Sequence, residues 1–253
     1  DAGPDALHGV VSGALPDTNR FGANESALYF PGGASIDLSD DTRFALDTAG
    51  TFSAWMNYVP NANGYLESAN SILGRNTNNH DYGYSFGPRG SEGLFETTLG
   101  LSGSNYFQYS NDMELAGWMH VAATFSASSD EYRLYVNGEL VQTEAFTAEA
   151  LIQPNCNTYI GKFRGTGGSC NCQYFTGSLD EIGIWSRELN ASEIMQLYQA
   201  SVNFGCTDET ACNYDAAADL DDGSCTFCCQ HCGPGTQWDE AAQWCVAILL
   251  TCG

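Results

Sequence analysis

The sequence predicts an all-β protein: an antiparallel sandwich with one short helix at its carboxyl-terminal end, followed by a small disulfide-rich module. Up to about residue 203 the chain consists of short apolar alternations separated by Gly, Asn, Asp and Ser, which is the pattern of strands and turns. The last 48 residues then hold eight of the 11 cysteines. We therefore expect two domains, over residues 1–203 and 204–253.

The expected strands are short, and turn residues bound each of them. Two of them flank Asn137-Gly138, the strongest local signal for a β-hairpin, because a type I′ turn needs two residues that accept a positive φ. In chain order, the candidate strand segments read "ALYFPGGASIDL", "FSAWMNYV", "SILGRN", "YGYSFG", "FETTLGL", "WMHVAATFS", "YRLYVNGELVQTEAF", "TYIGKF" and "SLDEIGIWSREL".

One segment, "NASEIMQLYQAS", has the period of a helix. Asn190 can cap its first turn, and Ile194, Leu197 and Tyr198 share one face. We expect the helix to begin near Asn190 and to end the sandwich. Large aromatics within alternating strands are usually buried, so the sequence also predicts that Trp55, Trp118 and Trp185 belong to the sandwich core.

The cysteine content predicts disulfides, and therefore a secreted or cell-surface protein. "CCQHC" offers one Cys-x-x-Cys pair but no second pair at a matching distance, which disfavours a zinc site. The three cysteines before residue 203 are an odd number, so at least one of them pairs elsewhere or not at all. The candidate disulfide residues are Cys156, Cys170, Cys172, Cys206, Cys212, Cys225, Cys228, Cys229, Cys232, Cys245 and Cys252.

The formal net charge of −23 excludes nucleic acid and anionic bilayers as partners, because both would be repelled. No segment approaches the roughly 20 apolar residues that span a bilayer, so membrane insertion is not expected. The amino-terminal residues lack the basic and apolar segments of a signal peptide, and we expect any such peptide to have been removed. The acidic residues suit either a solvated surface or Ca²⁺, a hard cation that prefers carboxylates.

Catalysis is not expected. His8, His80, His120 and His231 lack metal-binding spacing, and no serine or cysteine lies in a nucleophile-elbow motif. Asp180 and Glu181 lack a second, suitably spaced carboxylate, so we interpret them as residues that fix their strand through hydrogen bonds to loop amides.

Two strand segments carry aromatics that could stack on a ligand. They could equally belong to the core, since alternating tyrosine is typical of a strand. The candidate ligand-binding residues are Tyr82, Tyr84, Tyr106, Phe107 and Tyr109.

The order "LHGVVSGA", "ALYFPGGASIDL", "FSAWM", "GWMHVAATFSASSDEYRLYVNGELV", "IGKF" and "FTGSLDEIGIWSRELNASEIMQLY" closely resembles the laminin-G-like, concanavalin-A-like jelly-roll family that includes the pentraxins. The resemblance implies a jelly-roll sandwich over residues 1–200. The Glu-x-Asp-x-x-Glu strand of its sugar-cleaving relatives is absent here. The loop that holds calcium in pentraxins reads "GKFRGTGGSCNCQYF" and contains no acid. A different calcium position of the family implies Asp1, Asp5 and Asp180 as ligands, and the alternative is that the first loop is simply an exposed acidic loop.

The segment "GCTDETACNYDAAADLDDGSC" resembles a short repeat near the carboxyl ends of secreted proteins of marine bacteria, where such modules act as spacers. Its crowded carboxylates repel one another unless disulfides or a cation offset them. "DLDDG" is one residue shorter than the corresponding part of an EF-hand loop. The candidate Ca²⁺ ligands in this module are Asp215, Asp219, Asp221 and Asp222.

Two functions remain open at this point. The leading hypothesis is an extracellular recognition or adhesion module for glycans or other surface polymers, with the disulfide-rich module as its stalk. The alternative is a structural subunit of a surface appendage or filament that assembles with other copies of itself through sheet edges. Laminin-G-like chains usually begin with an apolar strand before the loop that here reads "DAGPDALHG", and this sequence starts without it. Either the boundary reflects processing, or another segment fills the vacant sheet edge, as in strand addition between subunits.

Overall fold

In the computed structural model, the chain divides into two compact units, residues 1–198 and residues 199–253. The structure describes residues 9–60, 70–76, 82–89, 94–101, 105–147, 150–152, 154–163, 174–200, 204–216, 218, 220–221, 223–226, 236–239 and 244–247.

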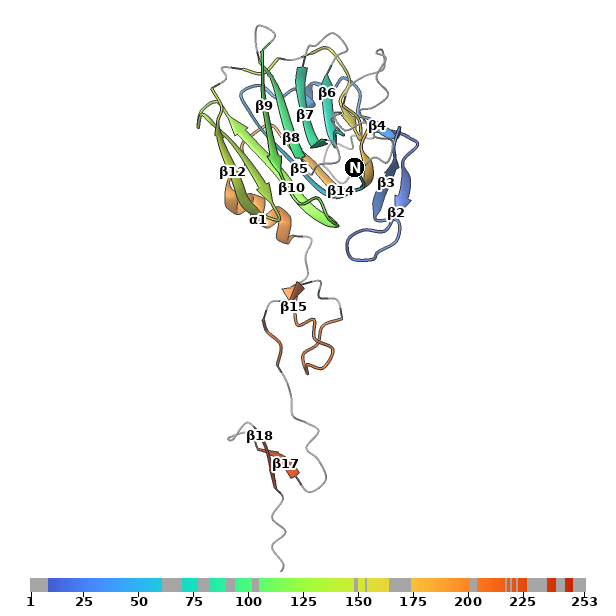
Figure 1. Ribbon diagram of the computed structural model, residues 1–253, viewed down its shortest axis with the longest axis vertical. Helices are drawn as coiled ribbons and strands as arrows, with labels where there is room; N and C mark the ends of the chain where they lie inside the picture. The colour runs from blue at the N-terminus through green and yellow to red at the C-terminus, as the bar shows by residue number, and fades with distance from the viewer. Residues whose placement is uncertain are drawn as a thin grey trace, which may run out of the picture. The chain divides into compact units, whose positions relative to one another are not determined.

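Within the described residues, two antiparallel sheets of seven strands each form the first unit (Figure 1). In spatial order, one sheet contains β1 (Val10–Ser12), β4 (Ser35–Asp37), β13 (Tyr159–Ile160), β6 (Leu73–Asn76), β7 (Tyr82–Arg89), β8 (Leu94–Leu101) and β9 (Asn105–Asp112). The other contains β12 (Glu139–Ala145), β11 (Glu131–Val136), β10 (Trp118–Ser126), β5 (Ala49–Tyr58), β14 (Thr176–Trp185), β3 (Ala27–Pro31) and β2 (Leu15–Asp17). A 3₁₀ turn, η1 (Thr42–Phe44), precedes β5. The predicted all-β sandwich is confirmed.

β5 is the central strand of the second sheet. It pairs with β10 from Ala49 to Asn57 on one side and with β14 on the other. The hairpin between β11 and β12 turns at Asn137 and Gly138, whose φ angles are 50° and 80°. The two-residue turn expected from the sequence is therefore present, and both of its residues have the left-handed conformation that this turn requires.

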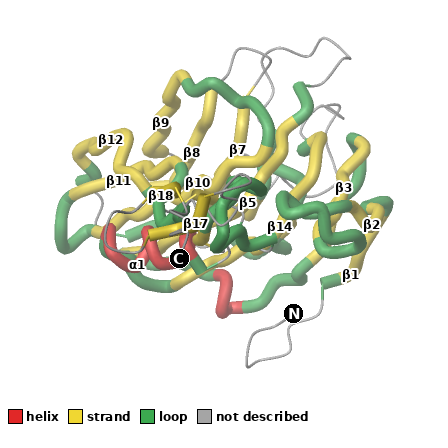
Figure 2. Tube along the Cα trace, turned by 90° about the horizontal axis from the view of Figure 1, so that it is seen from below, coloured by secondary structure: helices red, strands yellow, loops and turns green. Residues whose placement is uncertain are grey.

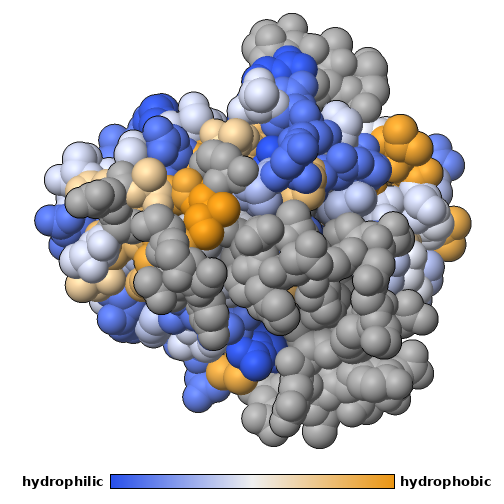
Figure 3. Space-filling model, turned by 90° about the horizontal axis from the view of Figure 1, so that it is seen from above, coloured by the Kyte–Doolittle hydropathy of each residue, from blue (hydrophilic) through white to orange (hydrophobic). Residues whose placement is uncertain are grey.

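The core lies between the two sheets and is rich in aromatic rings. Phe52 is fully buried, and its ring centroid lies 4.9 Å from that of Tyr84, 5.6 Å from that of Phe86 and 5.9 Å from that of Phe125. Burial of each such side chain stabilises the fold by about 2 to 3 kcal/mol. On the face seen from above, the described surface is mainly hydrophilic, and its hydrophobic residues form separate groups (Figure 3).

The prediction for the three tryptophans is confirmed only in part: Trp55 is buried, but none of the three packs between the two sheets. Successive strand residues point to opposite faces, and in β5 it is Phe52, Ala54, Met56 and Tyr58 that pack between the sheets. Trp55 is therefore on the outer face, although it is buried there. Trp118 and Trp185 are half-buried, and both alternate with core residues in their strands. The sequence indicates that these segments are hydrophobic, but not which face of its strand each tryptophan occupies.

The helix α1 (Ala191–Gln199) covers part of that outer face (Figure 1). The Glu193 amide donates a hydrogen bond of 3.0 Å to Asn190 Oδ1, and the Asn190 amide donates one of 2.9 Å to Glu193 Oε2. This reciprocal capping box fixes the start of the helix at the predicted residue. Ile194 is fully buried in a small cluster beneath the helix, with Leu197 packed against it. Tyr198 stacks on Trp55, with 5.6 Å between ring centroids.

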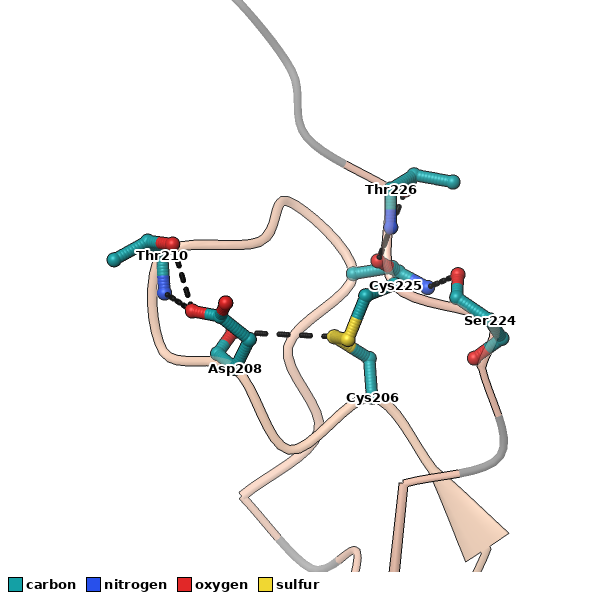
Figure 4. Close-up of a disulfide and its surroundings, with 7 residues drawn as sticks. Cys206, Asp208, Thr210, Ser224, Cys225 and Thr226 are labelled. Carbon is teal, nitrogen blue, oxygen red and sulfur yellow. Dashed lines mark hydrogen bonds between the residues drawn. A yellow bond between two sulfur atoms is a disulfide. The ribbon is translucent and has the colours of Figure 1, made fainter.

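The second unit contains short strands held by a disulfide. β15 (Phe204–Gly205) pairs with β16 (Leu220–Asp221), and β17 (Thr236–Asp239) pairs with β18 (Trp244–Ala247). Cys206 and Cys225 form a disulfide, and Cys212 is also disulfide-bonded. Near the disulfide, Asp208 Oδ1 accepts hydrogen bonds from the amide and the hydroxyl of Thr210 (Figure 4). In the part of the chain that the structure describes, no helix has the length and apolarity needed to cross a membrane.

Candidate functional site

Arg20 anchors the loop between β2 and β3 to the outer face of the second sheet. Its guanidinium carbon lies 4.0 Å from the centroid of Trp55 and 4.2 Å from that of Phe21. Its nitrogens lie 3.3 Å from Asp180 Oδ2 and 3.3 Å from Glu181 Oε1. Only 5% of the Arg20 side chain is exposed. The guanidinium thus combines two cation–π contacts with two ion pairs at a largely dehydrated position.

A β-bulge in β14 allows both acids to reach Arg20. Neighbouring residues of a regular strand point to opposite faces, but the register with β5 shifts between Asp180 and Gly183, and Glu181 has a φ of 47°. Burial and the neighbouring Glu181 raise the pKa of Asp180, while Arg20 opposes this. The sequence predicts that these acids accept hydrogen bonds from loop amides. Asp180 Oδ1 does accept a hydrogen bond of 2.9 Å from the Glu181 amide, but the partner that both acids share is the side chain of Arg20.

His120 lies next to this cluster and is almost completely buried. Its Nε2 is 2.9 Å from Ser53 Oγ, and its ring packs against those of Trp55 and Tyr198. Among the described residues, its Nδ1 has no hydrogen-bond partner. Burial, together with the positive charge of Arg20, lowers the pKa of His120 to about 4. The imidazole is therefore neutral at neutral pH.

This histidine makes stability dependent on pH. As pH falls, the histidine of the unfolded chain, with the ordinary pKa of 6.5, takes up a proton before His120 of the folded protein does. The stability that depends on a neutral His120 is therefore fully present above pH 6.5 and is lost as pH falls towards 4. Between pH 7 and pH 5 we expect His120 to reduce the free energy of unfolding by about 2 kcal/mol. Urea denaturation at both pH values should show this loss in the wild type and a clearly smaller loss in His120→Gln. Equal losses would contradict the assignment.

A polar hollow of about 600 Å³ lies between α1 and the β11–β12 hairpin. Its lining combines two arginines, two glutamates and one asparagine with three less polar side chains: Arg133, Tyr135, Leu140, Arg187, Glu188, Asn190, Ala191 and Glu193. We call this the polar hollow. The charges of its lining residues cancel, although the chain as a whole carries −23.

Ion pairs hold the charged groups of the polar hollow in place. Arg133 pairs with Glu188, which also accepts a hydrogen bond of 3.2 Å from Ser129. The two terminal nitrogens of Arg187 lie 2.7 Å and 3.1 Å from the two carboxylate oxygens of Glu193, a bidentate arrangement. These contacts lower the pKa of Glu193 to about 2, chiefly through the hydrogen bonds from Arg187. The hollow thus offers hydrogen-bond donors and ionised acceptors in fixed positions.

Residues 30–195 match the family model of the concanavalin A-like lectin/glucanases superfamily, which covers most of the chain. The chain belongs to this superfamily.

Solved structures with the same fold include two that are titled as binding domains. The "binding domain of Paraclostridial Mosquitocidal Protein 1" has a TM-score of 0.63, with 16% identity over 81% of this chain and 51% of that chain. The "Botulinum Neurotoxin serotype G binding domain" has a TM-score of 0.56, with 16% identity over 79% of this chain and 49% of that chain. This superfamily member therefore spans about half the length of these structures, and at such low identity the likeness concerns the fold. A comparison with curated proteins finds no match.

The aromatics proposed as ligand contacts in this superfamily member are placed as follows. Tyr84 is buried in the core, and its hydroxyl donates to the carbonyl of Phe44, so its ring is not accessible for stacking and the prediction is corrected for this residue. Phe107 and Tyr109 are half-buried, and each packs against Tyr132 with centroids 5.2 Å and 5.7 Å away. The alternative interpretation, that these aromatics pack against the core, therefore describes Phe107 and Tyr109 better than ligand stacking does. The side chains of Tyr82 and Tyr106 lie outside the described residues.

The predicted metal ligands are not brought together in the part of the chain that the structure describes. Asp180 pairs with Arg20, and Asp215 is exposed in the second unit. In the described ranges, no three His, Cys, Asp or Glu residues form a group that could hold a metal ion. The remaining candidates lie outside the described residues or have no described side chain: Asp1, Asp5, Asp219, Asp221 and Asp222. Calcium binding by these residues stays a prediction.

The cysteine predictions are tested only in part. Cys206, Cys212 and Cys225 are disulfide-bonded, as expected. Cys156 is half-buried before β13, and its predicted pairing stays a prediction. Cys245 lies in β18, and its side chain is not described. The others lie outside the described residues: Cys170, Cys172, Cys228, Cys229, Cys232 and Cys252.

Sequence reasoning missed the arginines. The chain has only eight basic residues, and three of them, Arg20, Arg133 and Arg187, make the contacts described above. Their scarcity among 31 acids was the available signal, because each of the few cations has many possible acidic partners. Which partner each one takes depends on the fold.

Proposed function

We propose that this protein is an extracellular recognition or adhesion module that binds a neutral, hydroxyl-rich polymer such as a surface glycan in the polar hollow. The observation that carries the proposal is the set of ion pairs facing this hollow, whose charges cancel in a chain of net charge −23. A strongly charged ligand would not be favoured there, whereas a neutral polar ligand would meet both donors and acceptors.

The chemistry of the hollow suits sugar hydroxyl groups, which both donate and accept hydrogen bonds. Arg133 and Arg187 supply only donors, while Glu188 and the ionised Glu193 supply only acceptors. Leu140 is 50% exposed and offers an apolar surface for the C–H groups of a sugar ring. Because the ion pairs already order these side chains, binding would cost less conformational entropy than binding to mobile groups.

The superfamily and its solved relatives support a binding role. The two solved structures described above are titled as binding domains, which favours recognition of a ligand over structural or catalytic work. In this proposal the disulfide-rich second unit is a stalk, and the protein is secreted or displayed on the cell surface, where disulfides persist. Any calcium bound in the first loop or the stalk would be structural.

Hydrolysis is not part of the proposal. A glycoside hydrolase needs one carboxylic acid that keeps its proton near neutral pH beside a second carboxylate. In the polar hollow, Glu193 has a pKa of about 2 and would be ionised. Cleavage of a polysaccharide panel that is abolished in Asp180→Ala or Glu181→Ala, with folding intact, would contradict a purely binding role.

The proposal can be tested by screening the protein on a glycan array and then measuring the affinity of any hit by calorimetry. We expect Arg187→Ala to weaken binding at least about tenfold, since it removes two donors from the hollow. Leu140→Asp should also weaken binding, because it removes the apolar contact. Arg43→Ala is the matched control: Arg43 forms a similar exposed pair with Asp41 away from the hollow and should leave affinity unchanged. A hit whose affinity is unchanged in both hollow variants would refute this site.

A further inference from the structure

The carboxyl-terminal end of α1 rests on two rings of the outer face of the second sheet. Tyr198 stacks on Trp55 of β5, with 5.6 Å between ring centroids, and its ring lies 6.0 Å from that of His120 of β10. The rings of Trp55 and His120 also contact each other, with 5.5 Å between their centroids. These three residues attach the end of α1 to the sheet, and we call them the ring latch.

The same end of α1 contacts the β11–β12 hairpin, which forms the other wall of the polar hollow (Figure 2). Gly138, at the hairpin turn, lies so close to α1 that a Cβ atom there would be 2.9 Å from Met195 Sδ and 3.1 Å from Tyr198 Cδ1. The Asn137 amide donates a hydrogen bond of 2.8 Å to the carbonyl of His120, and the His120 amide donates one of 3.0 Å to Asn137 Oδ1. His120 therefore lies where α1, the hairpin and the sheet meet.

The start of α1 is held independently of the ring latch. The hydroxyl of fully buried Thr51 donates a hydrogen bond of 2.8 Å to the carbonyl of Arg187 and accepts one of 2.9 Å from the amide of Leu189. The capping box of Asn190 and Glu193 follows directly. The two ends of α1 are therefore attached in different ways, by hydrogen bonds at the start and by ring packing at the end. The end can leave the sheet while the hydrogen bonds at the start remain.

A protonated His120 does not fit the closed ring latch. An imidazolium has two N–H donors, and each of them needs an acceptor when it is buried. Among the described residues, Nε2 of His120 has Ser53 Oγ as its partner and Nδ1 has none. A neutral imidazole can leave one nitrogen without a partner at lower cost than a charged one can.

The groups around His120 also oppose a positive charge on its ring. Arg20, from the loop between β2 and β3, is itself a cation, and the carboxylates of Asp180 and Glu181 in β14 pair with Arg20. The titratable group that α1 contributes is Tyr198, and the residues that β5 and the hairpin contribute are neutral: Ser53, Trp55 and Asn137. Burial and the charge of Arg20 lower the pKa of His120 to about 4, whereas in contact with water the ring would have its ordinary pKa of 6.5.

We propose that the ring latch is a pH-controlled gate of the polar hollow: in mild acid His120 takes up a proton, the end of α1 leaves the sheet, and the hollow opens between its two walls. The imidazolium then reaches water, which supplies the acceptor that the closed latch lacks. Opening is local, because α1 covers the sheet from outside whereas β5 and β10 are paired from Ala49 to Asn57. The consequence for a ligand, weaker binding in acid, rests on the proposed function, since it requires a ligand held between both walls.

Amide hydrogen exchange in the full chain, without ligand, tests the gate. Opening of α1 is coupled to protonation of a group whose pKa rises from about 4 to 6.5, so its opening equilibrium should increase about twentyfold between pH 7 and pH 5. We expect this increase in the amides of α1, after correction for the intrinsic pH dependence of exchange, while amides of β5 stay more strongly protected at both pH values. In His120→Gln, whose side chain can still reach Ser53 but does not titrate, the opening equilibrium of α1 should not change with pH.

Tyr198→Ala is a second, independent variant, because it removes the ring that α1 packs on His120. The pKa of His120, measured by NMR, should then rise towards 6.5. Equal pH dependence of α1 exchange in the wild type and His120→Gln would overturn the proposal, as would an unchanged pKa in Tyr198→Ala. Amides of α1 and β5 that exchange with the same free energy at every pH would also overturn it, because opening would then be global.

The ligand arm of the test uses any glycan that binds to the wild type. Its affinity should fall between pH 7 and pH 5 in the wild type and fall clearly less in His120→Gln, and an equal fall in both proteins, or in neither, would contradict control of the polar hollow by the gate. A gate that opens in acid without any glycan hit would refute only the proposed function. A glycan hit with pH-independent exchange of α1 would refute only the gate.

Discussion

Replacement of Arg20 by alanine is expected to lower the free energy of unfolding by about 4 kcal/mol, because it leaves a largely buried carboxylate without its cationic partner. Only 14% of the Asp180 side chain is exposed, and the pKa of this group is already raised by burial. The same substitution removes the guanidinium from over the rings of Trp55 and Phe21. This cation–π loss accounts for about 1 kcal/mol of the expected total. Urea denaturation followed by tryptophan fluorescence measures the effect.

Two comparisons make this prediction specific. Arg43→Ala removes an exposed pair with Asp41 and should have a much smaller effect. The cost of Arg20→Ala should also decrease at acidic pH, because Asp180, with its raised pKa, can then be protonated in the folded variant and no longer carries a buried charge. A cost that is small at neutral pH, or that does not change with pH, would mean that Arg20 does not neutralise Asp180.

Much of the fold could be predicted because its signals are local. Alternation within each segment indicates strands, Asn137-Gly138 indicates a hairpin, and Asn190 with Glu193 indicates the start of the helix. All three depend on residues within a few positions of one another. The outer position of Trp55 was not predicted, because alternation defines two faces of a strand but does not say which of them a helix from residue 191 will cover.

The sites depend on contacts between distant parts of the sequence. Arg20 and Asp180 are 160 residues apart, and Arg133 and Glu188 are 55 apart. The bulge that presents Glu181 to Arg20 also has no clear local signal, since glutamate rarely adopts a positive φ. These features follow from the assembled sheet and could not be inferred from the segments alone.

The second unit should depend on the Cys206–Cys225 disulfide much more than the sandwich does. Cys206 and Cys225 are 19 residues apart, and closing a loop of this length stabilises a folded module by about 3 kcal/mol. The described part of this unit has few buried side chains, chiefly Cys206 and Ala211, so hydrophobic burial contributes little to offset such a loss. The double variant Cys206→Ser, Cys225→Ser is therefore expected to unfold the segment around β15 while the sandwich remains folded.

Hydrogen exchange resolved by peptide can follow both units in the same sample. In the wild type, the amide of Cys212 donates to the carbonyl of Thr226 and that of Asp215 to the carbonyl of Cys206, so both should be protected. In the double variant this protection should be lost, whereas amides of β5 and β10 should exchange as slowly as before. The sandwich strands contain no cysteine among their described residues, and their core is formed by packed aromatic rings, so loss of the Cys206–Cys225 disulfide removes no contact from them. Simultaneous loss of protection in β5 and β10 would show instead that the two units fold as one cooperative structure, and the second unit could not then act as an independent stalk.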